Sequence, residues 1–124
     1  MNKQEIFDTV STHLIKQKRK SAVGGFGTTC YYHGPNGLKC AIGCLISDDV
    51  YNPKMEHQSV GGLINNFPLI PNYFKHDVQF LIALQNAHDC CFARSPDYVF
   101  DVNNLKHNLY SVAKTYELNT NILL

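Results

Sequence analysis

Residues 30–49, CYYHGPNGLKCAIGCLISDD, decide the predicted fold, because they combine the densest apolar run of the chain with its best turn signal. The residues at 28–33 are largely β-branched or aromatic, and such residues fit a pleated, half-buried strand. Residues 34–37, GPNG, then supply a proline and an asparagine for a turn and a glycine suited to positive φ. The sequence therefore predicts a β-hairpin over residues 28–46, with a strand through about Ala41 and a turn or helical start after it.

The segment before the hairpin, residues 1–20, is predicted to be an N-terminal amphipathic helix. Its apolar residues recur at helical spacing up to about Gln17, and Asn2 with Glu5 resembles a capping box. A cluster of cations marks its end: Lys16, Lys18, Arg19 and Lys20. These cations either complement the carbonyl end of the helix dipole or form a patch for nucleic-acid phosphates or an acidic partner.

The segment after the hairpin is predicted to be mostly helical over residues 72–124. Its longest helix covers residues 72–91, and Gln85 and His88 occupy positions on the inward stripe where apolar residues are expected. Together these patterns predict one α+β domain over residues 1–124. A small antiparallel β-hairpin or sheet is expected to be packed by about three main α-helices.

Composition and charge narrow the class of protein. The chain has 124 residues, of which 44% are hydrophobic and 17% charged, so it can bury a core without disulfides or metal. A net charge of +1 gives no overall attraction to nucleic acid or to an anionic membrane. No apolar run approaches the ~20 residues that span a bilayer, and the N-terminus lacks a hydrophobic signal segment. With five cysteines, an odd number, we expect reduced thiols and a cytoplasmic location without membrane association.

Two kinds of chemistry are open to the polar residues near the hairpin. A metal or small-molecule site, as in a nucleotide-binding sponge or a small hydrolase, could use six residues: Cys40, Cys44, Asp48, Asp49, His88 and Asp89. Thiolate and imidazole ligands would suit zinc, but the spacing of the two cysteines is not that of a zinc knuckle. The alternative is that the thiols are buried and inert, the aspartates cap a helix and His88 is hydrogen-bonded in the core, so no cofactor is predicted.

Aromatic residues provide a second candidate surface. Tyr31, Tyr32 and His33 precede the turn, and Tyr51 and Tyr73 follow it. Tyrosine is enriched in interfaces because it combines a large apolar area with a polar tip. The sequence therefore allows an aromatic patch near the hairpin that contacts a partner protein, with half of these residues packed in the core instead.

Residues 37–46, GLKCAIGCLI, followed by the acidic pair and Tyr-Asn-Pro, resemble a family of small uncharacterised bacteriophage and prophage proteins. Residues 84–89, LQNAHD, and residues 112–116, VAKTY, fit the same family. The resemblance implies a phage or prophage origin and the cytosol of a bacterial host. It carries no catalytic assignment, but small phage proteins of this size commonly block host enzymes or defence systems.

The predicted function is that of a non-enzymatic binding protein, a phage-encoded inhibitor of a host protein such as a defence-system component. The alternatives are the small-molecule or metal site and nucleic-acid binding through residues 16–20; a homo-oligomer is also left open. No residue is given a catalytic role. The predicted binding residues are Lys16, Lys18, Arg19, Lys20, Tyr31, Tyr32, His33, Asp48, Asp49, Gln85, His88 and Asp89.

Overall fold

The computed structural model describes residues 1–18, 31–89 and 102–124. Over these ranges it contains five α-helices, namely α1 (Lys3–Gln17), α2 (Val60–Asn66), α3 (Tyr73–His76), α4 (Val78–Asp89) and α5 (Val102–Thr115). Short 3-10 helices lie between and after them: η1 (Pro35–Gly37), η2 (Gly43–Leu45), η3 (Pro53–Met55) and η4 (Asn121–Leu123).

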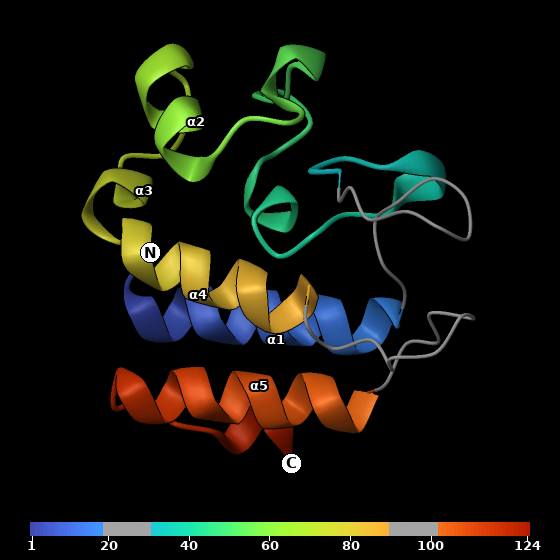
Figure 1. Cartoon of the computed structure of the whole chain (residues 1–124), viewed down its shortest axis with the longest axis vertical. Helices are drawn as coiled ribbons and strands as arrows, with labels where there is room; N and C mark the ends of the chain where they lie inside the picture. Colours follow the sequence, from blue (N-terminus) through green and yellow to red (C-terminus); the bar gives the residue numbers. More distant parts are fainter. Residues whose placement is uncertain (19–30, 90–101) are drawn as a thin grey trace.

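The three longest helices form one layer of the molecule. Figure 1 shows α1, α4 and α5 running along one another, and each of them contacts the other two. The segment 31–59 continues into α2 and α3, and together they cover one side of this layer. Helix η2 packs on α1, and α2 packs on α4, so both long helices support the irregular segment.

The core is continuous between the helical layer and the segment that covers it. Apolar side chains at helical spacing point inward from all three long helices, as their periodicity predicts. The fully or almost fully buried residues include Ile6, Phe7, Val10 and Leu14 from α1, Phe80, Leu81 and Leu84 from α4, Leu105, Leu109 and Ala113 from α5, and Cys40, Ala41, Ile42 and Ile46 from the covering segment.

Both ends of the chain are tied to α1. The capping box predicted at its start is confirmed, because the Asn2 side chain accepts from the Glu5 N–H at 2.8 Å and Glu5 accepts from the Asn2 N–H at 3.1 Å. In the same first turn of α1, Gln4 binds both main-chain groups of Asn119. Its Oε1 accepts from the Asn119 N–H at 2.8 Å and its Nε2 donates to the Asn119 carbonyl at 3.1 Å.

The predicted hairpin, and with it the α+β class, is wrong. Within the described residues the chain is helical and has no strand or sheet. The turn itself forms, because Asn36 and Gly37 adopt φ of 57° and 75° and the Gly34 N–H donates to the Leu38 carbonyl at 2.7 Å. The flanking residues pair at a single isolated antiparallel bridge, between His33 and Lys39.

The ladder stops there because side chains occupy the Tyr32 N–H, which the next pair would use, and the outward groups of His33 and Lys39, which a third strand would use. The Glu56 carboxylate accepts from the N–H groups of Tyr32 and His33, at 2.8 and 3.2 Å. On the other arm, the Gln17 amide accepts from the Lys39 N–H at 2.9 Å and donates to the Lys39 carbonyl at 3.0 Å. A carboxylate and an amide therefore do for these residues what a neighbouring strand would do.

The strand predicted through Ala41 is also wrong, although the same residues are buried. Cys40, Ala41 and Ile42 form a tight turn in which the Cys44 N–H donates to the Cys40 carbonyl at 3.1 Å, and η2 follows directly. A short apolar run fits a buried strand and a buried helical turn equally well. Here the run packs as a turn against α1 and α4.

One buried group in α1 is a source of instability. Ser11 is fully buried, and its hydroxyl finds no hydrogen-bond partner in the described part of the chain. We expect Ser11→Ala to raise the free energy of unfolding by about 0.5–1 kcal/mol, because it removes a desolvated hydroxyl and adds a better helix former. Ser111→Ala is the control, since Ser111 is exposed in α5. Urea denaturation of both variants measures the effect, and a loss of stability in Ser11→Ala would contradict it.

Candidate functional site

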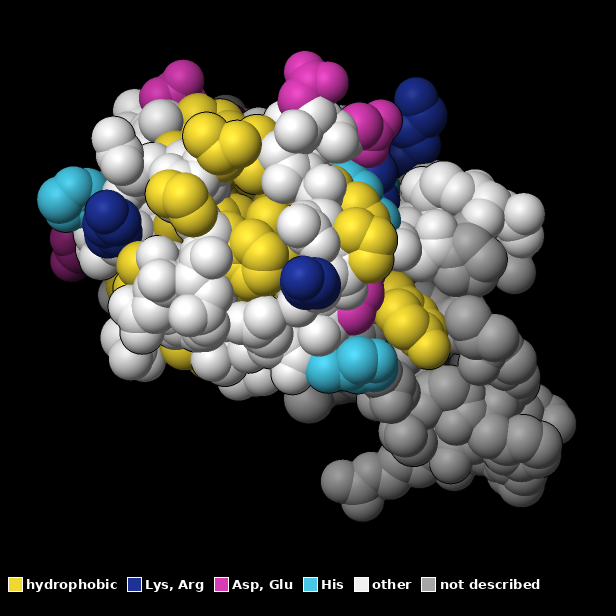
Figure 2. Space-filling model, turned by 90° about the horizontal axis from the view of Figure 1, so that it is seen from above, with side chains coloured by type: hydrophobic (Ala, Val, Ile, Leu, Met, Phe, Trp, Pro, Cys, Tyr) yellow, Lys and Arg dark blue, Asp and Glu magenta, His cyan; other side chains and the backbone are white. Residues whose placement is uncertain are grey.

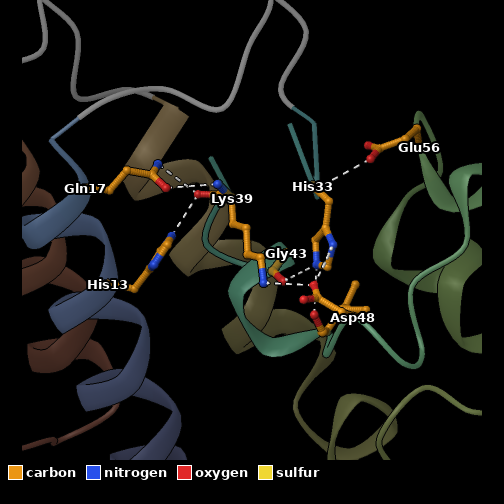
Figure 3. Close-up of polar contacts among 8 residues, drawn as sticks. His13, Gln17, His33, Lys39, Gly43, Asp48 and Glu56 are labelled. Carbon is orange, nitrogen blue, oxygen red and sulfur yellow. Dashed lines mark hydrogen bonds and ion pairs between the residues drawn. The ribbon is translucent and has the colours of Figure 1, made fainter. Parts of the chain in front are cut away.

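Residues 31–33 lie between η2 and the segment around Glu56, and all three are predicted binding residues. Glu56 holds their backbone from one side, as described above. The Tyr32 hydroxyl donates to the Gln58 carbonyl at 2.5 Å, which ties the ring to the same segment. Figure 3 shows His33 pointing away from Glu56 toward Gly43 and Asp48. We call residues 31–33 the central strip.

His33 bonds the central strip to η2. Its Nε2 lies 3.0 Å from the Gly43 carbonyl and 2.8 Å from the Ile46 carbonyl. Because both partners are acceptors, Nε2 carries the hydrogen and donates to the two oxygens. The imidazole also stacks on the Tyr51 ring, with centroids 4.2 Å apart and planes 16° apart. One nitrogen and one face of this histidine are therefore committed to internal contacts.

The second nitrogen of His33 faces a surface carboxylate. Its Nδ1 lies 3.6 Å from Asp48 Oδ1, and the same oxygen lies 3.4 Å from Lys39 Nζ (Figure 3). The Asp48 side chain is 85% exposed, so water weakens both contacts. Asp49 is also exposed and joins neither contact. The arrangement suits a weak, solvent-exposed ion-pair contact across the turn better than a catalytic acid–base pair.

Tyr51 and Glu56 complete the polar cluster. The Tyr51 hydroxyl donates to Glu56 Oε2 at 2.6 Å. Desolvation, followed by the hydrogen bond to Glu56 and the charge of that carboxylate, raises the pKa of Tyr51 to about 12. The phenol therefore stays protonated at neutral pH and acts as a donor that holds the carboxylate in place.

The two described cysteines are structural. Cys40 is buried and its sulfur accepts from the Gly43 N–H at 3.3 Å, while the Cys44 thiol donates to the Ala41 carbonyl at 3.0 Å. Burial, and then the proximity of Cys40, raises the pKa of the Cys44 thiol from 9.0 to about 12. A thiol that resists ionisation is a poor nucleophile and a poor metal ligand.

This raised pKa predicts slow chemical modification. At pH 8 we expect iodoacetamide to alkylate Cys44 at least about a hundredfold more slowly in the folded protein than in guanidinium, because the reactive thiolate is scarce and the side chain is partly buried. Peptide mapping by mass spectrometry follows the rate at this cysteine. Equal rates in the two conditions would contradict the assignment. Since the unfolded thiol titrates near 9.0 and the folded one near 12, the thiol also lowers stability as the pH rises above 9.

The polar residues predicted on the long helix point into the molecule. Gln85 Oε1 accepts from the Ile42 N–H at 3.1 Å, so this side chain supports the turn before η2. His88 is fully buried in α4. The backbone of Asp89 ends α4, while its side chain lies outside the described parts of the chain.

The proposed metal or small-molecule set is not assembled in the described residues. Over ranges 1–18, 31–89 and 102–124, no three His, Cys, Asp or Glu side chains lie close enough to hold a metal ion. Cys40 and Cys44 face the interior beside α1 and α4, whereas Asp48 and Asp49 are exposed at the surface. The sulfur and carboxylate atoms of these four residues therefore do not face a common centre.

The predicted cationic patch is described only in part. Lys16 and Lys18 are exposed at the end of α1, and Lys18 takes a left-handed conformation with φ of 55° while its N–H donates to the Leu14 carbonyl at 3.1 Å. Arg19 and Lys20 lie outside the described residues. Lys18 thus closes the helix through its backbone, as a left-handed C-cap does.

The aromatic patch is brought together in part. Tyr31, Tyr32 and Tyr51 lie around the central strip, and the Tyr31 ring meets His57 edge-on at 5.8 Å. Tyr73 belongs to α3 instead and packs against Phe74 at 5.3 Å. Figure 2 looks onto the side of the molecule formed by α2, α3 and the segment before them. Hydrophobic side chains gather across the middle of this face, and most of the charged groups surround them.

Sequence reasoning missed the residues that hold the strip and its turn in place. The backbone of the central strip is bound by Glu56, and the backbone of Lys39 is bound by Gln17 and His13. His13 Nε2 lies 2.9 Å from the Lys39 carbonyl. No local pattern marks them, because each acts on a residue more than twenty positions away in sequence. His13 and Gln17 share a face of α1 at i, i+4 spacing, which is the one signal that could have paired them.

None of the helices described is both long and apolar enough to cross a lipid bilayer. Compared with protein-family models, with curated protein sequences and with solved structures, the chain matches none of them.

Proposed function

We propose that this protein is a non-enzymatic binding protein that acts by occupying a partner protein. The observation that carries the proposal is the face in Figure 2, where hydrophobic side chains gather at the surface over α2 and its neighbours. A contiguous apolar area with charged groups around it is the usual composition of a protein–protein interface.

The polar cluster around the central strip supports the same proposal. Its groups, the imidazole of His33, the carboxylate of Glu56 and the phenol of Tyr51, bind backbone atoms or one another within the fold. They give the covering segment a fixed shape without a sheet, and a fixed shape lowers the entropy cost of binding. The resemblance to phage and prophage proteins favours a protein of the bacterial host cytosol as the partner, and inhibition as the outcome.

Affinity capture tests this function. The tagged protein is incubated with bacterial lysate, with and without nuclease treatment. Proteins that remain bound after washing are identified and quantified by mass spectrometry. We expect one host protein in stoichiometric amount. Recovery of the bait alone, or capture that disappears when nucleic acid is removed, would contradict the proposal.

A further inference from the structure

The connection between α2 and α3 presents one apolar side chain to solvent. Leu69 is 71% exposed, although the residue on either side of its turn faces the core. Phe67 packs against the core, and Ile70 is buried. A large aliphatic side chain that stays exposed to solvent contributes no burial free energy to the stability of the fold.

The turn that carries Leu69 is rigid. The Ile70 N–H donates to the Phe67 carbonyl at 3.1 Å, which closes a β-turn with Pro68 and Leu69 at its central positions. Pro68 fixes its own φ, and Pro71 restricts Ile70 just beyond the turn. Since both ends of the turn are rooted in the core, Leu69 is held in place before any partner arrives, and binding costs little ordering entropy.

The stretch of sequence around Leu69 carries no formal charge. From His57 to Phe74 the sequence contains no Lys, Arg, Asp or Glu. The exposed side chains that flank the turn are amides, those of Asn65, Asn66 and Asn72. This stretch offers no lysine or arginine to a phosphate or an anionic lipid, whereas interface centres are depleted in charge. This surface matches an uncharged apolar pocket whose rim offers hydrogen bonds to amides.

We propose that Leu69, at the tip of the 67–70 turn, is the anchor that inserts into an uncharged apolar pocket of the partner protein. The inference rests on the proposed function and identifies the side chain and the partner chemistry through which that function operates. Residues that carry most of the binding energy of an interface fill well-packed pockets from which water is excluded. An uncharged contact also makes binding nearly independent of salt.

The test compares capture by the wild type with capture by Leu69→Asp, Leu69→Ala and the control Tyr110→Asp. Tyr110 is likewise an exposed apolar residue, 45% exposed, but it lies on α5. A photo-crosslinking amino acid at Asn65 reports which molecule touches the turn. We expect Leu69→Asp to weaken capture at least about thirtyfold and Leu69→Ala about tenfold, with Tyr110→Asp unchanged. Capture should change less than about twofold between 0.1 and 0.5 M NaCl.

Each other outcome overturns the inference in a recognisable way. If the wild type and both Leu69 variants capture the same protein equally, the anchor is wrong while the proposed function stands. If no variant, including the wild type, captures a protein, both fall together. A cross-link between two copies of this chain would replace the partner by self-association. Circular dichroism of each variant confirms the fold, and Leu69→Ala keeps the test valid if the aspartate variant unfolds.

Discussion

Replacing Gly43 by alanine should unfold the protein or lower its free energy of unfolding by about 3 kcal/mol or more. A Cβ atom at this position would lie 1.8 Å from the Tyr32 carbonyl oxygen and 2.5 Å from the Tyr32 carbonyl carbon. Both are backbone atoms, and Glu56 holds the Tyr32 N–H from the other side. Neither η2 nor the central strip can move away without breaking these contacts.

The glycine is thus required for close approach of two backbones, since its φ is not positive. Gly61→Ala is the matched control, because the nearest atom to a Cβ there is Ser59 Oγ at an ordinary 3.8 Å. Gly61 lies within α2, where alanine should stabilise by up to about 1 kcal/mol. Thermal denaturation followed by circular dichroism should show opposite shifts of Tm. Similar small shifts in both variants would refute the close approach.

Replacing Glu56 by alanine should cost about 2–4 kcal/mol of stability. The carboxylate accepts from the N–H groups of Tyr32 and His33 and from the Tyr51 hydroxyl. Removing the carboxylate leaves these donors half-buried without their acceptor, and each such loss costs about 1–3 kcal/mol when burial is complete. The central strip would then lose its support against η2.

Two further variants separate this effect from the loss of a charge. Asp49→Ala removes an exposed carboxylate that has no hydrogen bond or ion pair in the described residues, and it should change stability by less than about 0.5 kcal/mol. Tyr51→Phe removes one of the three donors and keeps the aromatic stack on His33, so it should cost about 1 kcal/mol. Chemical denaturation of the three variants should rank Glu56→Ala as the most damaging. Equal effects of Glu56→Ala and Asp49→Ala would show that the three hydrogen bonds to Glu56 do not stabilise the fold.

The elements that local sequence controls were predicted well. Helix α1 begins at the predicted capping box and ends at Gln17, because the signals for both ends lie within a few residues of them. The turn at residues 34–37 also forms, since its proline, asparagine and glycine act on their own backbone. The single helix predicted over residues 72–91 is correct only as a helical region, because the structure divides its described part into α3 and α4 at Asp77.

The pairing of the turn's arms could not be predicted in this way. Whether residues 31–33 and 38–41 form strands depends on which groups reach their N–H and carbonyl groups first, and Glu56 and Gln17 come from other parts of the chain. The contacts of the candidate site could not be predicted for the same reason, because they also join residues that lie far apart in the sequence. His33 was singled out for its chemistry, but its binding to the Gly43 and Ile46 carbonyls follows from tertiary packing alone.

The contacts of α1 also determine the order in which the chain can fold during translation. Its Gln17 pairs with Lys39, and its Gln4 pairs with Asn119 near the other end of the sequence. Its apolar face packs on α4 and α5, which the ribosome makes after α1. Contacts so distant in sequence raise the contact order and slow the search for the native state. Helix α1 therefore becomes fully buried only after α4 and α5 have been made, and the burial of its apolar stripe depends on residues synthesised well after it.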